Sequence, residues 1–298
     1  MTGGDLCARI CGIGLVAPGI NDWDEGRLIL SGQQPWQHRP LAIPANEFLP
    51  AAERRRAGKA IRLALGCGHQ AIVNSGRPAE NMASIFASAD VDAENTHQIC
   101  LALKEAEPSL SPTRFHNSVQ NAVSGYWTIL TGSRAATTMV MGGDEILALG
   151  LLEAMSQAAT TNAPVLLVVF DVPMPAPLFA THPVDGGGAV ALVIEAGPGE
   201  GPTIRVRLLR RNGDAGVEGI GAHPKGAGRL MPDGLESLRG VHPLGAALPL
   251  LVQMAAPARP RRAEVVSGSC RSKAGAFDES GTSLLKFDRY HALQVTID

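Results

Sequence analysis

The sequence predicts an α/β layered fold built on a largely parallel central sheet. Apolar runs of strand length alternate along the chain with helix-like segments, which is the order of a strand–helix–strand fold. Residues 164–170 (PVLLVVF) and 189–194 (AVALVI) are continuously apolar, as expected for strands that are buried on both faces. The 34 glycines and 21 prolines supply the many turns that such an alternation needs.

The first half of the chain reads as a series of clear elements. Residues 8–16 run apolar into Pro18-Gly19, which predicts a strand closed by a turn. Residues 33–50 contain four prolines and no period, so we expect a loop there. Gly132 stands just past a predicted helix as its C-cap. The other predicted elements are helices at 23–31, 53–75, 97–107, 118–130 and 144–159, and strands at 82–89, 136–141 and 164–170.

The pattern weakens towards the C-terminus. Residues 204–209 alternate as an exposed edge strand would, and residues 212–232 are glycine-rich and predict a long loop. We place a boundary here, between residues 1–211 and a reduced C-terminal lobe, 212–298, packed on them. In that lobe we expect a short helix at 249–256 and strands at 263–267 and 283–297.

Composition and charge exclude several classes of function. The 298 residues can bury a core, and 45% apolar with 18% charged residues is typical of a globular chain. A formal charge of −2 gives no basic surface for nucleic acid or anionic lipid. The start of the chain lacks a signal-peptide pattern, and no stretch reaches the roughly 18 apolar residues of a membrane helix. We therefore expect a cytoplasmic protein that binds neither nucleic acid nor membrane.

The five cysteines and the glycine motifs point to no cofactor. Five is an odd number and the spacing matches no disulfide framework, so we expect free thiols. Cys7 and Cys11 lack the second pair that a zinc site requires. Gly12-x-Gly14 alone is too weak to indicate a nucleotide site. We expect neither a cofactor nor a metal.

A family resemblance rests on three stretches. Residues 111–159 carry Ser111-Pro112, Phe115, Asn121 and Gly125 in order, ahead of Thr131-Gly132. Residues 185–195 (DGGGAVALVIE) form a glycine-rich turn leading into a strand that ends in Glu, and residues 10–19 (ICGIGLVAPG) form an opening strand. This ordered set resembles the β-ketoacyl synthase family over residues 8 to about 210. The resemblance implies a layered thiolase-like (ketosynthase) fold, with its first half intact and its second half truncated or rebuilt.

The resemblance also implies that the catalytic cysteine is missing. In the family, a strand runs into a tight turn that presents this nucleophile at the start of a buried helix. Here that position falls on Asp144, after Gly142 and Gly143. A carboxylate is a weaker nucleophile, and its acyl anhydride hydrolyses readily. Aspartate suits a helix start, so we interpret Asp144 as an N-cap or a filler of the nucleophile slot. We expect no catalytic residue and no autonomous enzymatic activity.

The histidines agree with this interpretation. The family's His-Gly-Thr motif is absent from the chain. Residues 241–247 (VHPLGAA) are similar to the family's second histidine motif, so His242 is a candidate relic; a His before Pro in a turn is also an ordinary structural residue. His116 stands where the family lines its acyl tunnel near the dimer seam, and a polar residue at a helix start explains it equally well.

The predicted function follows from the resemblance. Chain-length factors of type II systems lack the nucleophile and pair with an active ketosynthase; this chain resembles them and the short ketosynthase-type proteins of aryl-polyene pathways. We expect a non-catalytic partner that forms a heterodimer with a ketosynthase subunit and shapes the acyl tunnel in fatty-acid or polyene-type biosynthesis. The residues predicted to line the tunnel or interface, with core packing as the alternative, are Phe115, His116, Val119, Asn121, Ala122, Gly125 and Tyr126.

Two alternatives stay open. The chain could be a stand-alone thiolase-fold decarboxylase or acyl hydrolase in which Asp144 acts with His116 or His242, which requires hydrogen-bond reach of roughly 3 Å. It could also be a scaffold that binds an acyl carrier protein, since carrier proteins are acidic. The triple arginine at residues 54–56 is the basic cluster that favours this scaffold, although a solvated helix face explains it as well.

Overall fold

The fold is described from a computed structural model of the whole chain. The structure describes residues 5–180, 184, 186–197, 201–210, 234–256, 282–286 and 291–297. Its first elements are β1 (Leu6–Val16), α1 (Trp23–Leu30), α2 (Ala51–Arg56), α3 (Lys59–Ser75), β2 (Ala83–Ser88), α4 (Ala93–Lys104), α5 (Pro112–His116) and α6 (Ala122–Thr131). The others are β3 (Thr137–Met141), α7 (Ile146–Thr161), β4 (Val165–Asp171), α8 (Ala176–Phe179), β5 (Gly188–Ala196), β6 (Thr203–Arg210), η1 (Leu235–Gly240), α9 (Leu244–Ala255), β7 (Thr282–Lys286) and β8 (His291–Ile297).

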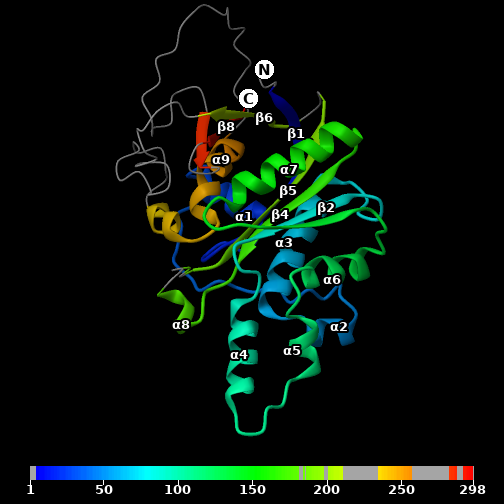
Figure 1. Cartoon of the computed structure of the whole chain (residues 1–298). Helices are drawn as coiled ribbons and strands as arrows, with labels where there is room; N and C mark the ends of the chain where they lie inside the picture. Colours follow the sequence, from blue (N-terminus) through cyan, green and yellow to red (C-terminus); the bar gives the residue numbers. More distant parts are fainter. Residues whose placement is uncertain are drawn as a thin grey trace, which may run out of the picture.

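The described strands form one eight-stranded mixed sheet in the order β3-β2-β4-β5-β1-β6-β8-β7 (Figure 1). The expectation of a largely parallel sheet holds only for the pairs β2–β3 and β2–β4. The other pairings are antiparallel. Parallel neighbours need a long crossover, whereas β5 follows β4 without a long helix among the described residues between them, so the chain reverses there and the two strands pair antiparallel.

Helices cover the two faces of the sheet, as the layered fold predicts. The core on one face includes buried apolar residues of α1, α7, η1 and α9, and the core on the other includes those of α3 and α6. Figure 1 shows α7 and α9 above the sheet, with α3 and α6 below it. The strand β4 lies between the two layers and is buried at every residue, which confirms that the run 165–170 is a central strand.

Three predicted helices differ from the structure in their extent. The segment 53–75 forms α2 and α3, because Ala57 takes an extended ψ of 118° between them. The helix predicted at 118–130 is not divided but starts later, as α6 at Ala122, and the separate short helix α5 ends before the predicted segment, at His116. Gly132 ends α6 at φ 65°, which confirms the predicted C-cap. The helix predicted at 97–107 begins earlier, at Ala93, because Asp92 caps it through the Asn95 N–H.

The C-terminal predictions are corrected in three respects. β6 is not an edge strand, since it pairs with both β1 and β8. The strand predicted at 283–297 is a hairpin of β7 and β8 that extends the same sheet. The helix predicted at 249–256 starts at Leu244, with Pro249 inside it. The predicted loop 212–232 and strand 263–267 lie outside the described residues.

Candidate functional site

The ends of three strands meet at one edge of the sheet. β2 and β4 run parallel and end at Ser88 and Asp171. β3 ends at Met141, directly opposite Ser88. Because the carboxyl ends of parallel strands share an edge, the turn after β3 lies beside the ends of β2 and β4. Gly142, Gly143 and Asp144 form this turn, which leads into α7.

The structure corrects one interpretation of Asp144. α7 begins at Ile146, its N-cap position is Glu145, and no side chain caps it. Asp144 therefore is not the N-cap; it is exposed in the turn before the helix. The turn closes through the backbone instead, where the Ile146 N–H donates to the Gly143 carbonyl at 3.1 Å. Gly142 is needed for packing, since a Cβ there would lie 2.6 Å from the Leu149 side chain of α7.

A buried carboxylate and an imidazole meet at the same edge. Asp171 is 3% exposed, and one of its oxygens lies 2.6 Å from Nδ1 of His242. Its other oxygen accepts from the Ser88 hydroxyl at 2.7 Å and from the Ala89 N–H at 2.9 Å. His242 lies between η1 and α9, so this one carboxylate connects the ends of β2 and β4 to the C-terminal helix.

The charges around His242 decide its protonation. Burial alone would lower the pKa of His242, but the hydrogen bond and negative charge of Asp171 outweigh it, and the pKa is raised. The carboxylates of Asp144 and Asp90 add to this upward shift. His242 thus lies within charge range of Asp144, while its hydrogen-bonded carboxylate is Asp171. An imidazolium held this way can donate a proton or a hydrogen bond.

A cavity of about 300 Å³ opens beside this pair. Its described lining comes from four segments of the chain: Pro18, Trp36, His38, Gly186, Ser237, Leu238, Gly240 and Val241. This volume is at the low end for a small-molecule site. Val241, which lines the cavity, directly precedes His242 in the chain, although neither His242 nor Asp171 is among the lining residues.

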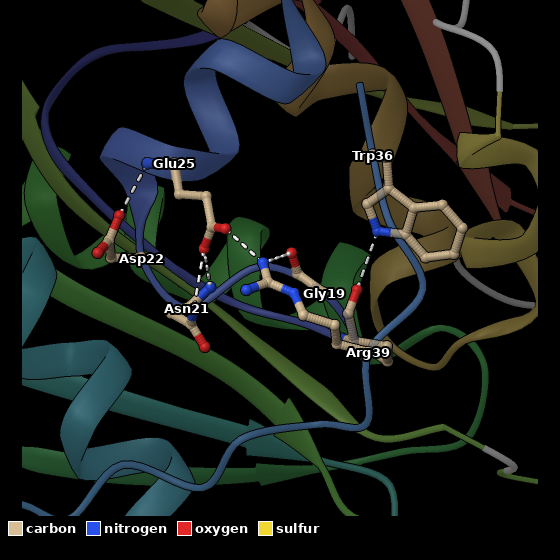
Figure 2. Close-up of polar contacts among 7 residues, drawn as sticks. Gly19, Asn21, Asp22, Glu25, Trp36 and Arg39 are labelled. Atoms are coloured by element: carbon tan, nitrogen blue, oxygen red, sulfur yellow. Dashed lines mark hydrogen bonds and ion pairs between the residues drawn. The ribbon is translucent and has the colours of Figure 1, made fainter. Parts of the chain in front are cut away.

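The loop 33–50 contributes Trp36 and His38 to the lining of this cavity, and polar contacts hold the loop in place (Figure 2). The Trp36 indole N–H donates to the Pro18 carbonyl at 3.0 Å. Arg39 donates to the Gly19 carbonyl at 2.6 Å and also pairs with Glu25 of α1. The loop is irregular, as predicted, but these bonds fasten it to the turn after β1 and to the start of α1 (Figure 2).

The residues predicted for the tunnel or interface fall into two groups. Phe115 is 66% and Val119 52% exposed, and His116, Asn121 and Gly125 are exposed as well. Ala122 and Tyr126 are buried inside the chain, where Tyr126 donates to Asn117. His116 packs edge-on against the Tyr126 ring, at 6.1 Å between ring centroids.

Two of the exposed members, Phe115 and Val119, are apolar, and further exposed apolar side chains lie on α6 and on β3, against which α6 packs. Ile129 of α6 and Met141 of β3 are exposed too, and β3 is the terminal strand of the sheet, paired only with β2 in the described order. α5 leads into α6, and α6 packs on β3. We call the exposed residues Phe115, Val119, Ile129 and Met141 the apolar edge surface.

A second exposed feature is the pair of helices α4 and α5. Figure 1 shows α4 and α5 projecting from the body of the molecule. Only Ala93 and Asn95 of the 12-residue α4 are buried, while Leu101 and Leu103 are exposed. A helix of this length is marginal alone in water and is normally stabilised by packing. Among the described residues, most of α4 is therefore without such packing.

Asp171 is the functional-site residue that the sequence reasoning missed. One signal could have found it: Asp171 directly follows the apolar run 164–170, at the carboxyl end of a predicted buried strand, where α/β sheets place their functional side chains. Its partner His242 lies 71 positions away, and no local pattern indicates that pairing.

The described residues offer no group of three or more His, Cys, Asp or Glu side chains that could hold a metal ion. In the same residues, no helix has both the length and the apolar character needed to cross a membrane. Cys67 is buried in α3, and burial raises the pKa of its thiol well above the ordinary value. Cys7, Cys11 and Cys100 also lie away from the turn that carries Asp144.

Comparisons with known proteins extend these findings. A family model described as β-ketoacyl synthase, N-terminal domain, matches residues 31–238. Among solved structures, a ketosynthase (ApeO) in complex with its chain length factor (ApeC) from Xenorhabdus doucetiae matches with a TM-score of 0.64 and 21% identity, covering 98% of this chain and 99% of that one.

Two further structures are similar over a smaller share of the chain. The ishigamide ketosynthase/chain length factor has a TM-score of 0.56 and 16% identity, over 68% of this chain and 67% of that one. A β-ketoacyl synthase from Burkholderia phymatum STM815 has a TM-score of 0.51 and 15% identity, over 64% and 59%. No curated protein matches the chain. At these identities, the solved structures establish the thiolase-like fold.

Proposed function

Because the chain belongs to the β-ketoacyl synthase family, we propose that it is a non-catalytic member that pairs with an active ketosynthase and shapes the acyl tunnel, as a chain-length factor does. One observation carries this proposal: Asp144 is exposed in the turn from β3 into α7, the position at which the resemblance implies the family's acyl-bearing cysteine. A carboxylate there cannot hold an acyl chain as a thioester.

The apolar edge surface supports a protein partner. Interface cores are enriched in aromatic side chains and Met, and isolated soluble chains rarely leave large apolar patches exposed. Phe115 and Val119 are more than half exposed on the segment that leads into α6, and α6 packs on β3, the terminal strand of the described sheet. A strand edge of this kind is also a template for pairing with another chain. We place the ketosynthase partner on this surface, with Phe115 and Val119 facing it.

The proposal also names the class of biosynthetic pathway in which the chain acts. Solved structures similar to this chain carry names that describe ketosynthase and chain length factor together. We extend that pairing to this chain and assign it to fatty-acid or polyene-type biosynthesis, with aryl polyenes as the nearest class. The partner then supplies the thiolate, while this chain supplies part of the tunnel wall.

Co-expression tests the pairing directly. The chain would be produced with an affinity tag beside untagged ketosynthases encoded near its own gene, and the purified material analysed by native mass spectrometry. A one-to-one complex with one of them supports the proposal. The Val119→Glu variant should lose the complex, whereas Leu208→Glu should keep it, because Leu208 is similarly exposed on β6, away from β3. A chain that purifies alone with every ketosynthase contradicts the pairing.

A second candidate function is acid–base chemistry at the same sheet edge. The observation that favours it is the Asp171–His242 pair, whose imidazole also senses the charge of Asp144. With Asp144 as base and His242 as proton donor, the chain would decarboxylate or hydrolyse acyl thioesters. Release of free thiol from acyl thioesters, or of CO2 from malonyl thioesters, by wild type but not by His242→Asn would support this function; only background release of both products would exclude it.

An acyl carrier protein is a further candidate partner. The triple arginine ends α2, and the Asn117 side chain donates to the Arg56 carbonyl at 2.8 Å, so these arginines lie beside α5 and the exposed apolar edge surface. A basic cluster next to an interface attracts an acidic protein. Charge reversal at Arg55, which is exposed, should weaken carrier binding in surface plasmon resonance, and unchanged binding would contradict the assignment.

A further inference from the structure

We propose that Asp171 and His242 form a protonation-dependent lock that fastens the start of α9 to the ends of β2 and β4. The lock joins elements far apart in the chain, since 71 positions separate its two residues. It goes beyond the partner role above, because it concerns how the C-terminal helix is held on the sheet.

The lock consists of three polar contacts made by the Asp171 carboxylate. Asp171 accepts from the Ser88 hydroxyl and the Ala89 N–H with one oxygen, and its other oxygen lies 2.6 Å from His242 Nδ1. The Ser88 oxygen also accepts from the Val91 N–H at 2.8 Å. The carboxylate is buried, so its charge is shielded little by water and its interaction with an imidazolium is strong. A carboxylate with two neutral donors and one cation is well satisfied.

The contact adds a polar anchor at the start of α9, a helix that buried apolar residues already hold in the core. The helix starts at Leu244 without a side-chain cap, so its beginning lacks the polar anchor that most helices have. His242 stands two residues before it and supplies one. The neighbours of His242 pack tightly on a glycine-rich turn: a Cβ at Gly186 would lie 2.9 Å from Val241, and one at Gly188 would lie 2.6 Å from Leu244.

The strength of the Asp171–His242 interaction depends on whether His242 is protonated. Three carboxylates act on His242, each from a different part of the edge: Asp171 at the end of β4, Asp144 in the turn before α7, and Asp90 after β2. They favour the imidazolium and raise the pKa of His242, although burial opposes them. The lock is therefore strongest below the ordinary histidine pKa of about 6.5 and weakens as pH rises through the raised value.

The lock also controls one wall of the cavity. Val241 lines the cavity beside Trp36 and directly precedes His242. When the lock weakens, the segment before α9 is released from the edge and this wall moves with it. A change in pH is thus transmitted from His242 to the cavity without any change in the central strands.

Hydrogen exchange of the whole chain tests the lock, with rates corrected for the intrinsic pH dependence of exchange. We expect protection at the start of α9 to fall as pH rises through the His242 transition, by about tenfold for each unit by which its pKa is raised. Protection in β4 should stay constant, because every residue of that strand is buried. The readout needs no ketosynthase partner, so it is independent of the pairing proposed above.

Matched variants decide the outcome. His242→Asn keeps a hydrogen-bond donor near the Nδ1 position but carries no titrating charge, so its α9 protection should be low and independent of pH. Ser88→Ala removes a neutral donor and leaves the charged pair, so the pH step should remain. A wild-type chain without the step, or a step that persists in His242→Asn, overturns the lock.

Discussion

Phe115→Ala removes an aromatic ring from the apolar edge surface, and its effect can be worked from exposure. A phenylalanine side chain buries roughly 150–250 Å² when it is enclosed. Phe115 is 66% exposed, so a partner that covers it buries about 130 Å² more. At about 25 cal/mol per Å², this area is worth about 3 kcal/mol. Alanine retains the Cβ, so we expect a loss of about 2 kcal/mol, or roughly thirtyfold in the dissociation constant.

The assay is a titration of the ketosynthase partner with wild type and variants by isothermal calorimetry. Leu208→Ala is the control, since Leu208 is 48% exposed on β6 and should not change the affinity. Melting temperatures of the isolated chains should be alike, because both residues are largely exposed. Equal affinities for wild type and Phe115→Ala, or equal losses for both variants, would refute the placement of the partner on this surface.

Two other predictions concern the chain by itself. Asp144→Asn should change the free energy of unfolding by less than about 0.5 kcal/mol, since Asp144 is exposed and does not cap α7. The same variant should lower the pKa of His242, measured by NMR titration, because the Asp144 carboxylate helps to raise it. Gly14→Ala should prevent stable folding, because its Cβ would lie 2.1 Å from the Cys67 carbonyl oxygen. Gly125→Ala, with nothing within 4 Å, should instead stabilise the chain by roughly 0.5–1 kcal/mol in thermal melts.

Local patterns in the sequence predicted the elements whose structure is decided locally. The apolar run at 165–170 became β4, and Gly132 ended α6 with a positive φ. Little in the sequence indicated that the predicted helix 53–75 would divide. Residues 54–57 are good helix formers, and Gly58 is the one residue of this stretch with a low helix propensity. Ala57 adopts an extended conformation there although alanine favours helices.

The apolar patterns in the sequence did not predict the direction of the strands. A continuous apolar run indicates burial on both faces, and β5 has that burial over most of its length although it runs antiparallel to β4 and β1. Direction depends on the connection between strands, and the described residues of the link from β4 to β5 hold one helix, the four-residue α8. An apolar pattern within a strand carries no information about that connection.

The candidate site was predicted in part. The family resemblance pointed to Asp144 and His242, and the structure brings them within charge range of each other. The interpretation of Asp144 as an N-cap was wrong, since residue preference describes helix starts on average and Glu145 holds that position here. Asp171 escaped notice because a contact between distant residues leaves no local pattern.

Acyl loading of the assembled heterodimer tests the non-catalytic assignment most directly. The complex would be incubated with an acylated carrier protein, and both chains examined by intact-mass spectrometry under denaturing conditions. We predict that the acyl mass appears on the partner ketosynthase alone. An acyl adduct on a cysteine of this chain would contradict the assignment.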